Sequence, residues 1–131
     1  MDVRLATCRH LPRLTPDDDL LRLALEGRGV RVTPAPWDVI DPGAGPLVCL
    51  RSTWDYHRRW PQFRRWVEGF AAHPARLWNP ASTVLWNADK VYLRDLAHAG
   101  VAIPATRWFE PGERPDWQAF LQETEIGRAH V

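Results

Sequence analysis

Residues 78–108 read WNPASTVLWNADKVYLRDLAHAGVAIPATRW, and they contain one predicted helix with a start signal and a stop signal. Asn87 is the expected N-cap, because an Asn side chain accepts hydrogen bonds from free N–H groups at the start of a helix. The acidic Asp89 suits the first turn that follows. Gly100 is the expected end of the helix, and Pro104 prevents any continuation. The stretch therefore predicts one helix between these two signals, after a turn at the first proline.

Lys90 does not fit this helix well, because the third helical position favours an acid and the helix dipole disfavours a cation there. A cation at an exposed position in the first turn costs only about 0.3 kcal/mol, so Lys90 can be an ordinary solvent-exposed lysine. The alternative is a bound anion, since backbone N–H groups and an ammonium directed at one point form a phosphate site. The spacing alone leaves both interpretations open.

The first part of the chain predicts a β-α-β unit. Residues 3–7 form a short apolar run that is typical of a strand. Residues 15–18, Thr-Pro-Asp-Asp, are a strong helix start with a cap, a proline and two acids. Gly27 and Gly29 end that helix before an apolar strand at 30–32, and the two strands are expected to be parallel.

The rest of the chain predicts an α/β fold with a small parallel sheet. The predicted segments are a loop over 33–46, a strand over 46–50, a helix over 58–72, strands over 76–78 and 106–109, and a helix over 116–122. The run at 46–50 is short and wholly apolar, as in a central parallel strand. No internal repeat or low-complexity segment is present.

Ligands of open α/β sheets bind beyond the carboxyl ends of the strands, and this rule selects a group of candidate residues. The candidates for substrate binding are Thr7, Arg51, Ser52, Thr53, Asp55 and Tyr56. Arg51 could clamp a carboxylate, and Asp55 could accept from an amine or a hydroxyl. The alternative is structural: Ser52 or Asp55 caps the next helix, and Trp54 fills the gap between sheet and helix.

Composition excludes several classes. The chain has 131 residues, 45% hydrophobic and 25% charged, which are globular values. Its net charge of +1 gives no bulk attraction to nucleic acid or to a membrane, so a single-stranded nucleic-acid platform at the aromatic and basic residues 51–66 is disfavoured. Cys8 and Cys49 make no disulfide framework, and Cys8 with His10 lacks the further ligands of a metal site. No signal peptide or long apolar span is present, so we expect a cytoplasmic protein.

Two segments resemble a known superfamily. The pattern N-x-D-K at residues 87–90, followed by A-G-V-x-I-P-x-T at 99–106, resembles the entry into the nucleotide-binding domain of ATP-grasp ligases. The segment LVCLRSTWDYH at 47–57 resembles the glutathione-synthetase-like branch, which includes the cyclo-ligase that makes D-cycloserine. The resemblance implies a pre-ATP-grasp (Rossmann-like) domain over 1–79, then a linker helix and the truncated start of an ATP-grasp domain over 80–124.

The resemblance also implies an activity. Such enzymes join a carboxylate to an amine through an acyl phosphate made with ATP, and Lys90 occupies the position of the superfamily lysine that contacts the ATP phosphates. The Mg²⁺ ligands and catalytic residues of the superfamily lie in a C-terminal part that this sequence lacks. A small amino-acid or peptide-like substrate is implied, and a homo-oligomer stays open.

Residues 125–131 read EIGRAHV, which resembles the translation of a common sequencing adapter, so the natural sequence is expected to depart from this one after residue 124. The chain is thus expected to be an N-terminal fragment that is inactive alone. The competing hypothesis is a non-enzymatic α/β binding or regulatory domain in which Lys90 is an ordinary surface residue.

Overall fold

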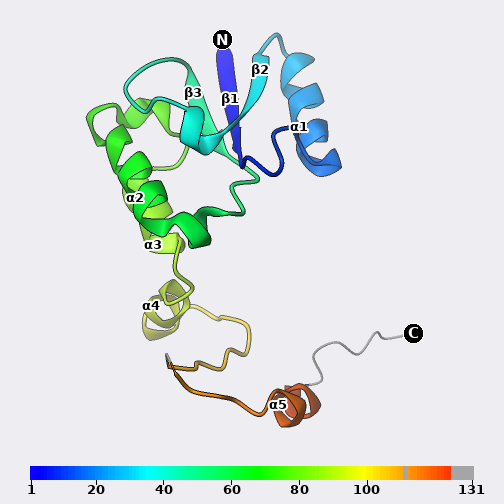
Figure 1. Cartoon of the computed structure of the whole chain (residues 1–131), viewed down its shortest axis with the longest axis vertical. Coiled ribbons are helices and arrows are strands. Elements are labelled where there is room, and N and C mark those ends of the chain that lie inside the picture. Colours follow the sequence, from blue (N-terminus) through cyan, green and yellow to red (C-terminus); the bar gives the residue numbers. More distant parts are fainter. Residues whose placement is uncertain (111, 125–131) are drawn as a thin grey trace. The chain divides into compact units, whose positions relative to one another are not determined.

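The computed structural model describes residues 1–110 and 112–124, and the chain divides into two compact units, Met1–Tyr92 and Leu93–Val131. Within the described residues, the sheet has three parallel strands, β1 (Asp2–Thr7), β2 (Arg31–Pro36) and β3 (Leu47–Leu50), in the order β2-β1-β3 (Figure 1). The predicted α/β class and the parallel β-α-β unit are confirmed.

Helix α1 (Pro16–Glu26) starts where the sequence predicts, since the hydroxyl of Thr15 accepts from the backbone N–H of Asp18 at 3.1 Å. It covers one face of the sheet, where Leu21 and Leu25 pack on a cluster of buried residues. That cluster consists of Val3, Leu5 and Val32. The helix therefore ties β1 to β2 through an apolar layer.

Strand β2 continues to Pro36, so the prediction of a loop from residue 33 is wrong at its start. The N–H of Arg31 donates to the carbonyl of Met1 at 3.0 Å, and N–H groups in a strand point alternately to its two sides. Pro34 and Pro36 therefore occupy positions that face away from β1. An edge strand tolerates proline there, because no ladder hydrogen bond is lost.

The opposite face of the sheet is covered by aromatic residues. The predicted helix over 58–72 is confirmed as α2 (Trp60–Glu68), with 3₁₀ turns at its two ends, η2 (Tyr56–Arg59) and η3 (Gly69–Ala72). Its inward side chains meet Trp37 of the 3₁₀ turn η1 (Trp37–Val39). The Trp37 and Phe63 ring centroids lie 5.3 Å apart, and the Trp66 indole N–H donates to the carbonyl of Ile40 at 2.8 Å. This layer holds the chain that follows β3 against the sheet.

The prediction of a fourth strand over 76–78 is wrong except for one bridge at Leu77. Residues 74–76 form a 3₁₀ turn, η4 (Pro74–Arg76), and Leu77 makes a single parallel bridge to Val48. The N–H of Trp78 donates to the carbonyl of Val48 at 2.9 Å. The Arg76 guanidinium accounts for the turn, because it donates to backbone carbonyls of the loop at residues 41–46.

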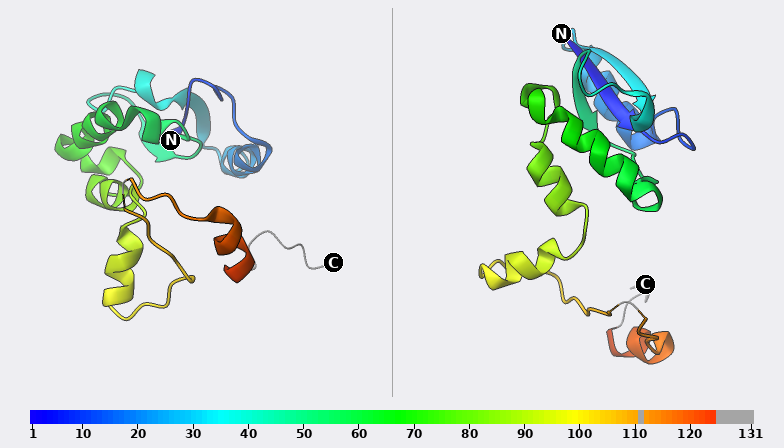
Figure 2. Two further views of the ribbon diagram at one scale, coloured as in Figure 1. Left: turned by 60° about the horizontal axis from the view of Figure 1, so that its bottom comes forward. Right: turned by 60° about the vertical axis from the view of Figure 1, so that its left-hand side comes forward.

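Asn87 is the last residue of helix α3 (Ala81–Asn87), so the prediction that it caps the following helix is wrong. The chain turns helical directly after Pro80, because Val84 and Leu85 pack against the aromatic core. Helix α3 lies beside α2 (Figure 2). The next helix, α4 (Tyr92–His98), begins five residues beyond Asn87.

Helix α4 ends as predicted at Gly100, whose φ of 78° suits glycine, and the N–H of Val101 donates to the carbonyl of Leu96 at 3.0 Å. Helix α5 (Trp117–Thr124) confirms the helix predicted over 116–122. The strand predicted over 106–109 is wrong. The Phe109 ring lies 5.5 Å from that of Trp117, so this segment packs on a helix, and it pairs with no strand among residues 1–110 and 112–124.

The adapter-like segment 125–131 lies outside the described residues. Among residues 1–110 and 112–124, no helix has both the length and the apolar character that crossing a bilayer requires.

Candidate functional site

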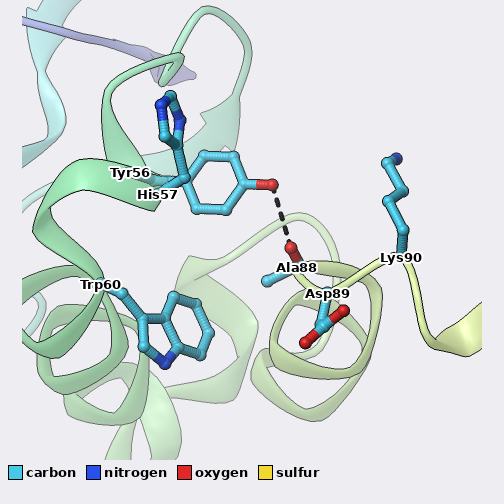
Figure 3. Close-up of a pocket in the computed structure, with 6 residues that line it drawn as sticks. All are labelled: Tyr56, His57, Trp60, Ala88, Asp89 and Lys90. Atoms are coloured by element: carbon cyan, nitrogen blue, oxygen red, sulfur yellow. Dashed lines mark hydrogen bonds between the residues drawn. The ribbon is translucent and has the colours of Figure 1, made fainter. Parts of the chain in front are cut away.

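An open pocket of about 430 Å³ lies beside the turn that carries Lys90 (Figure 3). One wall comes from η2 and the start of α2, and the other comes from the turn between α3 and α4. The lining residues are Tyr56, His57, Trp60, Ala88, Asp89 and Lys90. A second pocket of about 290 Å³ shares Tyr56, Ala88 and Lys90 and adds Thr53. Three of the predicted site residues, Thr53, Tyr56 and Lys90, are therefore brought together.

Lys90 lies in a turn and not at the third position of a helix. The carboxylate of Asp89 accepts from the N–H of Val91 at 3.0 Å, and the carbonyl of Asp89 accepts from the N–H of Tyr92 at 3.3 Å. The Lys90 ammonium is exposed and lies 5.4 Å from the centre of the Tyr92 ring. Because α4 begins only at Tyr92, the unfavourable interaction of the Lys90 charge with the helix dipole is weaker than predicted. Lys90 is also the only lysine among the 17 lysines and arginines of the sequence.

Arg51 and Ser52 contact the carboxylate of Asp18, which the sequence predicts only as part of a helix start. The Arg51 Nε donates to Asp18 at 2.7 Å, and the Ser52 hydroxyl donates to the other oxygen of that carboxylate. Asp18 is only 4% exposed. Its burial raises its pKa, but the hydrogen bonds from Ser52 and Arg51 outweigh this effect and leave the pKa below its usual value. The N-cap positions of η2 and α2 are Asp55 and Arg59, so Ser52 does not cap the next helix.

The sequence offered one signal for Asp18, its place three residues after the capping threonine. That place explains an acid at the start of α1. It does not reveal that the carboxylate also reaches the end of β3, because this contact depends on how α1 packs on the sheet.

Asp55 faces the aromatic core. Its carboxylate accepts from the indole N–H of Trp37 at 2.8 Å, and it makes no capping hydrogen bond to η2. Asp55 stands at the N-cap position of η2, but its side chain makes no capping hydrogen bond, so the alternative of a side-chain cap is wrong. Trp54 is 62% exposed, so the alternative that it fills the gap between sheet and helix is wrong too. Its indole is open to solvent beside the carboxyl end of β3.

Asp38 holds a second ion-pair cluster at this end of the sheet. Its carboxylate accepts from the Arg9 Nε at 2.6 Å and from Arg59 at 2.7 Å. Burial raises the pKa of Asp38, but these two guanidinium groups outweigh it and leave the pKa lowered. Arg59 also lies over the Trp37 ring at 4.7 Å.

Thr7 lies at the end of the central strand, next to the end of β3, since the N–H of Arg51 donates to the carbonyl of Ala6 at 3.1 Å. The carboxyl ends of β1 and β3 therefore lie at one edge of the sheet, as the sequence predicts. The side chain of Thr7 is fully buried, and its hydroxyl has no hydrogen-bond partner in the described structure. A substrate role for Thr7 stays a prediction.

Metal-ligating side chains do not gather in the part of the chain that the structure describes. Within residues 1–110 and 112–124, no group of three or more His, Cys, Asp or Glu side chains could hold a metal ion. Cys8 is buried and Cys49 is half-buried, and both are free thiols. The Mg²⁺ that the resemblance implies has no such ligand group among these residues.

Comparisons with known proteins point to one family. Residues 3–79 match the family described as D-cycloserine synthetase DcsG, N-terminal domain. The chain is 33% identical over 86 residues to the cycloserine biosynthesis protein DcsG of Streptomyces lavendulae, a match that covers 64% of this chain and 28% of that protein. The crystal structure of D-cycloserine synthetase DcsG matches with a TM-score of 0.70 and 29% identity, over 98% of this chain and 44% of that one. The chain thus spans less than half the length of the relatives that it matches.

Proposed function

Because the chain belongs to the family of D-cycloserine synthetase N-terminal domains, we propose that it is the N-terminal part of an ATP-dependent carboxylate–amine ligase of the ATP-grasp type. The family match over residues 3–79 is the observation that carries the proposal, since it spans all of the sheet except Asp2 and includes α2. It also includes the predicted substrate residues at the carboxyl ends of β1 and β3. The activity is proposed for a protein of the relatives' full length, since the chain spans 28% and 44% of the two relatives.

The proposed reaction has two steps. A substrate carboxylate oxygen attacks the γ-phosphorus of ATP, which gives an acyl phosphate and releases ADP. An amine then attacks the acyl carbon, loses a proton and expels phosphate as the amide bond forms. Charge builds on the phosphoryl oxygens in the first step, and a cation placed beside them stabilises that charge.

Lys90 is the proposed phosphate contact of this chain. Its ammonium is exposed in an open pocket, where a phosphate tail can reach it without displacing protein groups. No carboxylate neutralises it through a salt bridge among the described ion pairs. A lysine offers a compact charge with three donors, which suits a flexible phosphate chain.

The substrate is proposed to bind at the carboxyl ends of β1 and β3. Arg51 keeps 39% of its side chain exposed although it pairs with Asp18. The carboxylate of Asp18 thereby orients a guanidinium that still faces solvent. An amino-acid or peptide-like molecule offers the carboxylate that such a guanidinium binds.

The test compares two variants of the full-length gene product by calorimetric titration with ATP. Lys90→Met removes the ammonium, and Arg65→Met removes an exposed cation of α2 outside both pockets. A contact with a charged group is worth about 1.5–3 kcal/mol, so Lys90→Met is expected to weaken ATP binding about 10- to 100-fold. Arg65→Met is expected to bind ATP like the parent.

Release of ADP that depends on an added amino-acid substrate completes the test. A full-length product that binds no ATP, or whose ATP affinity is the same after Lys90→Met, would contradict the proposal and favour a non-enzymatic binding domain.

A further inference from the structure

The side chain of Tyr56 connects two parts of the candidate site. Tyr56 begins η2, directly after the segment 51–55 that follows β3. Its hydroxyl donates to the carbonyl of Ala88 at 3.0 Å, across 32 residues of sequence (Figure 3). Ala88 lies two residues before Lys90, in the same turn. The hydrogen bond therefore joins the end of a sheet strand to the backbone that carries the ammonium.

The ring of Tyr56 is held by the aromatic core. Its centroid lies 5.2 Å from that of Phe63 and 6.5 Å from that of Trp60. Phe63 is only 3% exposed and packs on Trp37. A rigid ring with two rotatable bonds, packed in this way, places its hydroxyl at a defined point. The carbonyl of Ala88 is thus attached to the core of the first unit.

The turn has no comparable attachment of its own in the hydrogen bonds described for it. The contacts of Asp89 with Val91 and Tyr92 fix the local shape of the turn, because all three residues lie within it or directly after it. They do not connect it to the sheet. Helix α3 reaches the core through Val84 and Leu85, but this helix ends before Ala88.

We propose that Tyr56 is a positioning residue for Lys90. Its hydrogen bond to Ala88 sets where the turn lies, and therefore where the ammonium meets the two pockets that Tyr56 and Lys90 line together. This inference rests on the proposed function, in which Lys90 binds the phosphates of ATP. It gives Tyr56 a role through Lys90, in place of direct contact with substrate.

The test is a double-mutant cycle on the full-length gene product, with the dissociation constant for ATP as the readout. Tyr56→Phe removes the hydroxyl and keeps the ring contacts, and Lys90→Met removes the ammonium. The matched control is Tyr92→Phe, which removes the hydroxyl of the only other tyrosine and keeps the ring beside Lys90. Thermal unfolding of each variant is measured in parallel.

Tyr56→Phe is expected to weaken ATP binding about three- to tenfold, the equivalent of one hydrogen bond, and Tyr92→Phe is expected to leave it unchanged. The double variant is expected to bind ATP as weakly as Lys90→Met alone, because the hydroxyl acts only through the ammonium. If Tyr56→Phe only destabilised the fold, it would weaken ATP binding by the same factor in the parent and in Lys90→Met. Non-additive effects on the dissociation constant therefore separate positioning from a structural role.

Two other outcomes have different meanings. If Lys90→Met weakens ATP binding but Tyr56→Phe does not, or if the two effects add, the role of Tyr56 is overturned and the proposed function stands. If Lys90→Met leaves ATP binding unchanged, the proposed role of Lys90 fails, and the positioning role of Tyr56 fails with it.

Discussion

Replacement of Asp18 by Asn tests whether the buried carboxylate joins α1 to the end of β3. In the parent chain the carboxylate accepts from Arg51 and Ser52, and both contacts join residues more than 30 positions apart. An Asn side chain keeps nearly the same shape but has only one acceptor oxygen. Its NH₂ group is a donor and would face the N–H of Arg51 or the hydroxyl of Ser52, which are donors too. One of the two contacts is therefore lost.

The expected cost follows from the kind of contact that is lost. A hydrogen bond to a charged group contributes about 1.5–3 kcal/mol. Arg51 is 39% exposed, so solvent screens part of this interaction and the lower part of the range applies. We expect the free energy of unfolding to fall by about 2 kcal/mol at pH 7, which lowers the melting temperature by about 10 °C in a unit of this size.

The pH dependence gives a second, independent readout. The pKa of Asp18 is lowered in the folded chain from its usual value of 3.8. A lowered pKa stabilises the fold above the pKa of the unfolded chain, and this contribution is lost as the pH falls through the folded value. The difference between the parent and Asp18→Asn should therefore be largest at neutral pH and shrink below pH 3.8.

Urea unfolding of the 131-residue chain, followed by tryptophan fluorescence, measures both quantities. Asp19→Asn is the matched control, because Asp19 is the next residue, is 45% exposed and pairs with Arg22 on the same helix. It is expected to change stability little. An equal stability of the parent and Asp18→Asn at pH 7, or a difference that is the same at pH 7 and pH 3, would show that the Asp18 carboxylate does not join α1 to the end of β3.

Three further substitutions are expected to change the free energy of unfolding. Thr7→Val should raise it by about 1 kcal/mol, because it removes a buried hydroxyl that lacks a partner; a fall would show that the hydroxyl is satisfied. Arg76→Lys should lower it by about 1–3 kcal/mol, since an ammonium cannot reproduce the planar fork that reaches several loop carbonyls; an unchanged value would contradict this. Gly69→Ala should lower it by about 1–3 kcal/mol, because a Cβ would come within 2.9 Å of Pro42, and a rise, as helix propensity alone predicts, would contradict the packing argument.

Local signals predicted those parts of the fold that depend on neighbouring residues. The start of α1 follows from Thr15 and Pro16, and the end of α4 follows from Gly100, because caps and positive φ angles are properties of a few adjacent residues. The adjacency of Thr7 and Arg51 also followed, since parallel strands end at the same edge of a sheet.

Tertiary packing decided the rest. Asn87 has the side chain of an N-cap, yet the burial of Val84 and Leu85 against α2 makes it the end of an earlier helix. The Arg51–Asp18 pair depends on the pairing of β3 with β1 and on how α1 packs on the sheet, which no local pattern encodes. The hydrogen bond from Tyr56 to Ala88 likewise needs η2 and α3 to be in place first.

The two prolines of β2 also limit how the sheet can be enlarged. Pro34 and Pro36 remove N–H donors from the side of β2 that faces away from β1, so an incoming strand finds few partners there. The other border, along β3, already accepts a bridge from Leu77. Any strand that a larger assembly adds is therefore expected to join beyond β3, and accidental association of two copies through β2 is suppressed by the chain itself.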